Sequence, residues 1–218
     1  REFSWTWENT LTYDKIFNKI HHINVMGMMS MEKSNTETES LNYTGVLDGT
    51  TWYNLGSGTY NANGSAPSSY TEYRMLSYAM RANYTLNNRY MATATIRWDG
   101  SSRFREGKKW GSFPSFALAW RISEENFWKE SKIASIFSDL KIRGSYGLVG
   151  DDNVDGYSAF DYMTGYDYKQ GGGVIDGSYI IGTTPRNLPV TTLSWAKAKI
   201  LDIGLDVAFL NNRLSGSV

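Results

Sequence analysis

The 218-residue chain has no cysteine, only 4 prolines and a formal net charge of zero. The absence of cysteine excludes a disulfide framework, a thiolate metal site and a cysteine nucleophile. A net charge of zero gives no electrostatic reason to expect nucleic acid or an anionic surface as a partner. No run approaches the ~18 apolar residues of a transmembrane helix, which excludes a helical span only, because barrel strands need just ~9–11 residues each.

Aromatic residues and glycine are abundant instead, with 15 Tyr, 8 Trp and 21 Gly. Hydrophobic residues make up 41% of the sequence and aromatic residues 15%, so the chain is not expected to be disordered. Because aromatic residues favour strands, this composition is typical of a β-protein.

Residues 70–122 show the organisation of the chain most clearly. From Leu76 to Tyr84 every second residue is apolar or aromatic, and the alternation resumes from Tyr90 to Trp98 after a turn. A third segment, 112–120, repeats this alternation of apolar or aromatic residues with small or polar ones. A period of two places the two sets of residues on opposite faces of a sheet. The aromatic residues fall near the strand ends, with aliphatic residues and alanine between them, which is typical of a lipid-facing barrel wall.

The rest of the chain repeats the pattern, which predicts an all-β, antiparallel transmembrane barrel wall of about eight strands. The other strands are expected at about 4–13, 20–31, 139–149 and 198–209, with an eighth after a turn at 210–213. Short or compact connections alternate with longer polar ones at 32–69, 100–109 and 150–194. Outer-membrane barrels have this asymmetry, with short periplasmic turns and long extracellular loops. One compact connection, 123–128, is predicted to be a helical turn with Ser123 as its N-cap.

Charge is confined to one face of the predicted strands. The outward positions within these spans carry no Lys, Arg, Asp or Glu, although the chain is 20% charged. A charge at mid-bilayer costs ~2–4 kcal/mol on the lipid face of a barrel, so one face is expected to lack charges. The inward positions, predicted to face a wet lumen, hold Glu8, Arg81, Arg97, Arg121, Lys141, Arg143, Asp202 and Asp206.

Five motifs in order carry a family resemblance. They are Asp99-Gly100-Ser101-Ser102-Arg103-Phe104, Trp110–Ser115, Ala119–Glu125, Leu140–Gly147 and Asn211–Gly216. Over residues 70–218 this set resembles the SusC/RagA-type TonB-dependent outer-membrane transporters of Bacteroidetes-like bacteria. The sequence departs from the family pattern at 149–151, where Thr-Gly-Asn is usual, and at 195–196, where Trp-Glu is common.

The resemblance implies a barrel of about 22 strands with a plugged lumen. It also implies an N-terminal plug, a segment that contacts the TonB complex, and a SusD-like surface lipoprotein as a lid. Residues 1–218 would form part of the barrel domain, without plug, signal peptide or C-terminal strands. The implied function is TonB-energised import of a glycan or peptide oligomer, without a cofactor. Two alternatives stay open, a passive outer-membrane porin and a soluble carbohydrate-binding β-domain that buries its apolar face against a second sheet.

The candidate substrate-binding residues lie in the long connections. They are Arg103 and the aromatic residues Trp52, Tyr53, Tyr60, Tyr157, Phe160, Tyr162, Tyr166 and Tyr168. Such rings stack on sugars or grip peptides, but they also pack within their own loop or against a lid protein. Arg103 belongs to a turn-forming Asp-Gly-Ser-Ser sequence, so a purely structural role is the competing interpretation.

Metal-binding and catalytic patterns are weak. Residues 151–156, Asp-x-Asn-x-Asp-Gly, match the start of a calcium loop, but the twelfth position is Tyr162 instead of an acidic residue, so no metal site is predicted. His21 and His22 are adjacent and would point to opposite faces of a strand. The sequence has no Gly-x-Ser-x-Gly, His-Glu-x-x-His or phosphate-loop motif, and no enzymatic activity is predicted.

Overall fold

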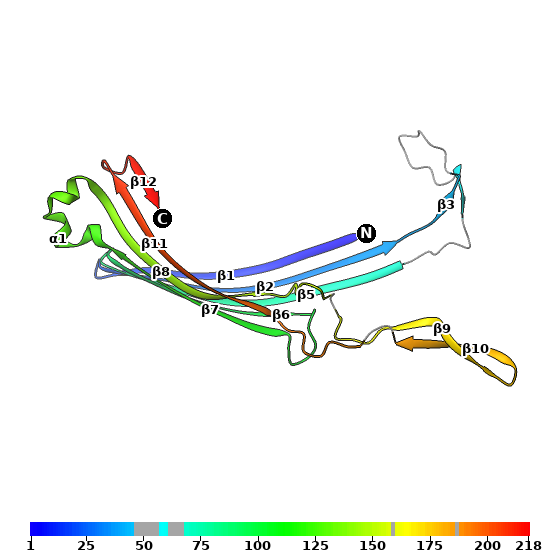
Figure 1. Cartoon of the computed structure of the whole chain (residues 1–218). Coiled ribbons are helices and arrows are strands. Elements are labelled where there is room, and N and C mark those ends of the chain that lie inside the picture. The colour runs from blue at the N-terminus through cyan, green and yellow to red at the C-terminus, as the bar shows by residue number, and fades with distance from the viewer. Residues whose placement is uncertain (46–56, 61–67, 158–159, 186–187) are drawn as a thin grey trace.

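A computed structural model describes residues 1–45, 57–60, 68–157, 160–185 and 188–218. Within these ranges eight antiparallel strands form one sheet, in which each strand pairs with the one before it. They are β1 (Glu2–Phe17), β2 (His21–Glu39), β5 (Ser68–Leu86), β6 (Tyr90–Ser101), β7 (Trp110–Arg121), β8 (Phe137–Asp151), β11 (Ala196–Phe209) and β12 (Leu214–Ser217). The predicted all-β, antiparallel, eight-stranded wall is confirmed, and Figure 1 shows it as one curved layer.

The connections differ strongly between the two ends of the sheet. Among the described residues, the other elements are β3 (Tyr43–Thr44), β4 (Thr59–Tyr60), β9 (Tyr166–Ile175), β10 (Ser178–Pro185), α1 (Asn126–Lys129) and the 3-10 turns η2 (Ile122–Glu124) and η3 (Lys132–Ser135). In Figure 1, α1 lies at one end, whereas β3 and the β9–β10 hairpin lie beyond the other. No helix among the described residues is long and apolar enough to cross a membrane.

Paired residues with positive φ make the tight turns. Asn87 and Asn88 have φ of 50° and 58°, and the Arg89 N–H donates to the Leu86 carbonyl at 2.9 Å. Two successive left-handed residues match the right-handed twist of the flanking strands, and asparagine tolerates this conformation better than most residues. Residues 18–19, Asn-Lys, repeat the arrangement between β1 and β2.

Strand register confirms the predicted faces. Trp7, Met31, Leu76, Gly100 and Trp110 lie opposite one another across successive strand pairs from β1 to β7. The pairing of β7 with β8 and of β8 with β11 continues the same alternation. We call the face that carries these residues the apolar face and the opposite one the polar face.

The apolar face is open. Phe116, Leu118, Leu201 and Ile203 are all at least 60% exposed. In the described part of the chain no second layer covers them, in contrast to the sandwich expected of the soluble alternative (Figure 1). The eight charged residues predicted to point inward all lie on the polar face by register. Because no layer of the described chain covers the apolar face, its side chains require another apolar environment, such as lipid.

Two predicted loops are partly strand, and both predictions were wrong in extent. β2 continues to Glu39 instead of ending near Met31, and it pairs with β5 as far as Ser68. The ladder persists because backbone pairing does not require apolar side chains where both faces meet water. The expected loop 150–194 contains the β9–β10 hairpin, whose Asp176-Gly177 turn has positive φ at both residues.

The predicted cap of the helical turn was also wrong. Ser123 lies inside η2 instead of at an N-cap, and its hydroxyl donates a hydrogen bond to Asp139. Glu125 occupies the N-cap of α1 without a side-chain cap bond. Its carboxylate instead accepts hydrogen bonds from Tyr90 Oη at 2.6 Å and Trp120 Nε1 at 3.1 Å, and pairs with Arg89 at 3.0 Å. The carboxylate therefore ties the compact connection to the ends of β6 and β7.

This tie predicts an acid-sensitive turn. The hydrogen bonds from Tyr90 and Trp120, with Arg89 nearby, hold the pKa of the Glu125 carboxyl below its usual value. A lowered folded-state pKa gives stability that is present above the ordinary carboxyl range, about pH 4.3, and is lost as pH falls through the lowered pKa. Tyr90→Phe should therefore raise amide hydrogen exchange in residues 122–131 several-fold at neutral pH and bring the acid transition to higher pH. Tyr84→Phe, which removes a hydroxyl bonded to His21 instead, should not.

Candidate functional site

A hollow of about 420 Å³ on the polar face is the candidate site. It lies at the end of the sheet from which the long connections leave. Its lining includes Arg97, Asp99, Phe113, Asp152 and Trp195. Arg97 pairs with Asp99 at 2.7 Å and also donates to Ser77 at 3.0 Å. Asp99 is only 6% exposed, so the wall of the hollow contains a charge that is almost completely withdrawn from water.

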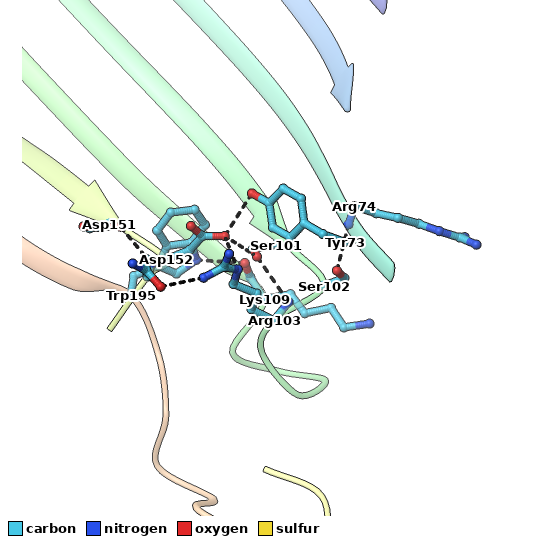
Figure 2. Close-up of polar contacts among 10 residues, drawn as sticks. Tyr73, Arg74, Ser101, Ser102, Arg103, Lys109, Asp151, Asp152 and Trp195 are labelled. Carbon is cyan, nitrogen blue, oxygen red and sulfur yellow. Dashed lines mark hydrogen bonds and ion pairs between the residues drawn. The ribbon is translucent and has the colours of Figure 1, made fainter. Parts of the chain in front are cut away.

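Asp152 joins three segments at the rim of the hollow (Figure 2). Its Oδ2 accepts hydrogen bonds from Tyr73 Oη at 3.0 Å and from Ser101 Oγ at 2.6 Å. Arg103 Nε lies 3.8 Å from the same oxygen. These partners come from β5, from the end of β6 and from the connection after β6, so one carboxylate fixes the relative positions of all three.

Arg103 is occupied by contacts within the protein. Its guanidinium lies over the Tyr73 ring at 5.1 Å and donates to Asn153 Oδ1 at 2.8 Å. Its backbone N–H donates to Ser101 Oγ at 3.2 Å. In this arrangement Arg103 holds the connection 102–109 against the exit of β8, which is the structural role weighed against substrate contact.

An apolar cluster covers the hollow from the side of the connections. Phe104, Phe113, Leu193 and Trp195 form it, and Phe104 is 1% exposed. The Trp195 ring lies 5.5 Å from Phe104 and 5.2 Å from Phe113, and its Nε1 donates to the Lys109 carbonyl at 2.8 Å. Burial of aromatic side chains is worth roughly 1.5–3 kcal/mol each, so the cluster holds two distant connections together over the polar face.

Ion pairs continue along the polar face away from the hollow. Lys141 pairs with Asp206 at 2.8 Å, and Arg143 pairs with Asp202 at 2.9 Å and with Asp206 at 3.4 Å. Gly204 lies opposite Arg143, and a Cβ at that position would come within 2.7–2.8 Å of the guanidinium. The glycine therefore leaves the space in which Arg143 lies against the strand and reaches both carboxylates.

Comparison with known proteins establishes the family. The family profile described as "TonB dependent receptor-like, beta-barrel" matches residues 2–218. The chain belongs to the TonB-dependent receptor β-barrel family. Receptors of this family are outer-membrane β-barrels that transport and are not enzymes, so the apolar face is the one that meets lipid.

Relatives at the sequence level agree. The chain is 39% identical over 150 residues to the TonB-dependent receptor SusC of Bacteroides thetaiotaomicron. This aligned region covers 68% of this chain and 14% of that protein. It is 30% identical over 210 residues to the TonB-dependent receptor P26 of Formosa agariphila, covering 96% of this chain and 20% of that protein. The chain thus spans one fifth or less of the length of these curated relatives.

Solved structures share the fold. A structure of the RagAB peptide transporter matches with a TM-score of 0.77 and 22% identity, covering 99% of this chain and 23% of that chain. The RagAB peptide importer in its "open-open" state matches with a TM-score of 0.81 at 22% identity, covering 99% of this chain and 22% of that chain. The eight strands therefore correspond to a portion of the wall of a SusC/RagA-like barrel.

Among the loop aromatic residues predicted to bind substrate, those whose side chains the structure describes do not line the hollow. Tyr60 packs against Tyr43 in the β3–β4 pair at 5.7 Å, and Phe160 lies 6.2 Å from Tyr162. Tyr157 and Tyr166 are exposed. Trp52 and Tyr53 lie outside the described residues, and Tyr168 lies in β9 with its side chain outside the description.

The predicted inward charges of this receptor wall differ in their partners. Arg97, Lys141, Arg143, Asp202 and Asp206 form the ion pairs given above. Arg121 lies 3.6 Å from Asp139 and donates to Asn88 at 3.1 Å. Glu8 and Arg81 are exposed on the same face.

Side chains of the segment 151–156, which resembles the start of a calcium loop, form hydrogen bonds within the protein. Asp151 Oδ1 accepts the Asn153 N–H at 2.8 Å, and Asn153 Oδ1 faces Arg103. Among the described residues no group of three or more His, Asp or Glu side chains is placed to hold a metal ion.

Sequence reasoning missed the residues that organise the site. Asp152 lies between the positions of the calcium pattern, which drew attention to its neighbours Asp151 and Asn153. Trp195 appeared only as a departure from a family motif, and Phe113 only as a position within the motif Trp110–Ser115. One signal in the sequence could have identified them. Phe104, Phe113 and Trp195 are aromatic residues of the family motifs that lie on the polar face or in a connection, where contact with lipid cannot explain an aromatic side chain.

Proposed function

We propose that this wall belongs to a transporter that imports a glycan or peptide oligomer through TonB-energised release, with a SusD-like lipoprotein as its lid. The observation that carries the proposal is the strand register, which keeps one face free of charge and places paired charges on the other. Residues 1–218 would be part of the barrel domain of the larger protein. The family relationship supports the energy coupling, since these receptors take their name from TonB.

In this proposal the polar face lines the lumen. Glu8, Arg81 and the ion pairs of β6–β11 give a hydrated surface against a plug, and the hollow beside Asp99 is a contact point on the substrate path. The exposed aromatic residues, Tyr157 and Tyr166 among them, belong to the extracellular capture surface. Phe104 and Trp195 hold together the connection 102–109 and the connection before β11. This contact supports an entrance to the lumen that is formed before substrate binds.

The test uses the whole transporter in cells with and without TonB. Uptake is measured for a fluorescent oligopeptide and a fluorescent oligosaccharide of similar mass. We expect uptake of one of the two to fall to the level of cells without the transporter when TonB is deleted. Uptake that persists without TonB would instead identify a passive porin. Uptake of neither probe above that of cells without the transporter would contradict the substrate class.

A further inference from the structure

The apolar face changes abruptly to a charged one near the end that bears the long connections. Trp7, Met31, Leu76, Gly100 and Trp110 form the last apolar row across β1–β7. Two residues further along each strand, about 7 Å away, the next row holds Trp5, Lys33 and Arg74, with Ser102 beside Arg74. In barrels with extracellular long loops, this boundary lies at the outer leaflet.

The basic side chains at the boundary share one carboxylate. Lys33 Nζ lies 2.9 Å from Glu72, and the Arg74 guanidinium and the Tyr70 hydroxyl also contact this carboxylate. Lys109 adds a third cation from the connection before β7. Figure 2 shows the side chains of Arg74 and Lys109 extending away from the Asp152 network. The Arg74 side chain is 64% exposed, so it is available to a ligand.

These residues border a groove of about 540 Å³. Its apolar side is formed by Trp5, Met31, Leu76 and Trp110, and its charged side by Lys33, Arg74 and Lys109, with Glu32 also at its edge. The Trp110 ring stacks on Tyr78 at 6.2 Å and covers Gly100, where a Cβ would meet it at 3.0 Å. Glycine therefore lets the indole lie flat and leaves the groove open above it.

The groove continues into the apolar face. Two rows nearer the middle of the sheet, a second shallow hollow of about 310 Å³ is lined by Met80, Ala82, Ala94, Ile96 and Phe116. Its small residues, Ala82 and Ala94, lie in β5 and β6, the same strands that carry Leu76 and Gly100 of the groove. A ligand with an anionic head at Lys33 and Arg74 and apolar chains over Leu76 and Met80 would match both parts.

We propose that this groove binds a phosphorylated glycolipid of the outer leaflet. Phosphate oxygens accept hydrogen bonds from the fork of Arg74 and from the amines of Lys33 and Lys109, while acyl chains follow the apolar rows. The neutral net charge of the chain conceals this local excess of cations over Glu72 and Glu32. The assignment is independent of the proposed substrate, because the groove is on the opposite face of the sheet from the hollow.

The experiment measures binding of diphosphorylated lipid A to the whole transporter purified in detergent. Each cation near an anionic lipid contributes about five-fold in affinity, so Lys33→Gln with Arg74→Gln should weaken binding about 25-fold. Glu72→Gln frees both cations and should tighten binding. The matched control, Arg105→Gln with Lys108→Gln, removes the same charge from the neighbouring connection and should bind as the unmodified protein does. Dephosphorylated lipid A should bind weakly to every variant.

The double variant should weaken lipid binding and Glu72→Gln should strengthen it, and these opposite effects distinguish ligand binding from a purely structural role. If the ion pairs only stabilise the strands, Glu72→Gln will lose as much binding as the double variant, and the proposal fails. Equal binding by the double variant and its control would also overturn it, as would complete displacement of the lipid by millimolar inorganic phosphate. Heat-modifiable migration on a gel confirms that each variant is a folded barrel, and binding is compared only among those.

Discussion

Ala94→Lys is expected to weaken the folding equilibrium of the transporter in lipid strongly, whereas Ala117→Lys is expected to leave this equilibrium close to that of the unmodified protein. Ala94 lies on the apolar face between Ala82 and Phe116, midway along the spanning part of β6. A lysine at the lipid midplane costs about 2–4 kcal/mol in a barrel. Since about 1.4 kcal/mol is a tenfold change in an equilibrium constant, the equilibrium constant for folding in lipid should fall about 30-fold or more.

Ala117 is the matched control, because it receives the same substitution at almost the same depth on the other face. It lies opposite Thr93 and Ser145 and borders a polar-face hollow that also contains Asp202. The measurement is the amount of heat-modifiable, membrane-inserted transporter and its folding equilibrium in lipid vesicles. Equal insertion of the two lysine variants would mean that the assignment of the faces is wrong.

Asp152→Ala is expected to detach the connection 102–109 from the exit of β8. The change leaves the hydroxyls of Tyr73 and Ser101 without their acceptor and removes the charge beside Arg103, at a cost of about 2–3 kcal/mol. Amide hydrogen exchange in residues 101–109 should then rise about 30-fold or more. Asp155→Ala, at an exposed position of the same segment, should leave that exchange unchanged.

Two outcomes of the Asp152 experiment would count against the network. Unchanged exchange at residues 101–109 would mean that the cluster of Phe104 and Trp195 alone holds the connection. A rise spread evenly over all strands would mean that the change destabilises the whole barrel. The network predicts a rise that is local to the connection and to the segment after β8.

The sequence predicted the wall because each strand carries its own information. The period of two fixes the face of every residue once the phase of its strand is known, and aromatic residues such as Trp98, Tyr84 and Trp120 mark the two ends of the strands. Those are local signals, and the register of the structure agrees with all of them. Strand ends were harder to predict, since residues 32–39 are polar on both faces and extend the strand because β5, and β1 as far as residue 36, lie beside them.

The site was not predictable in the same way. Asp152 and Ser101 are 51 positions apart and Trp195 and Lys109 are 86 apart, so nothing local in the chain associates them. Arg103 looked available to substrate because its partners come from β5 and from the exit of β8. Ser123 looked like a cap because the pattern of serine followed by acidic residues is correct for one, but the chain places Ser123 inside η2, where its hydroxyl donates to Asp139.

Each strand of the sheet neighbours the strand that precedes it in the chain. The wall can therefore be assembled strand by strand in chain order, although β5 and β11 pair with β2 and β8 only across the long connections that precede them. This order also explains how the chain accommodates the β9–β10 excursion: β11 resumes the ladder on β8, so the length and content of the excursion are free to vary without disturbing the order in which the wall is built.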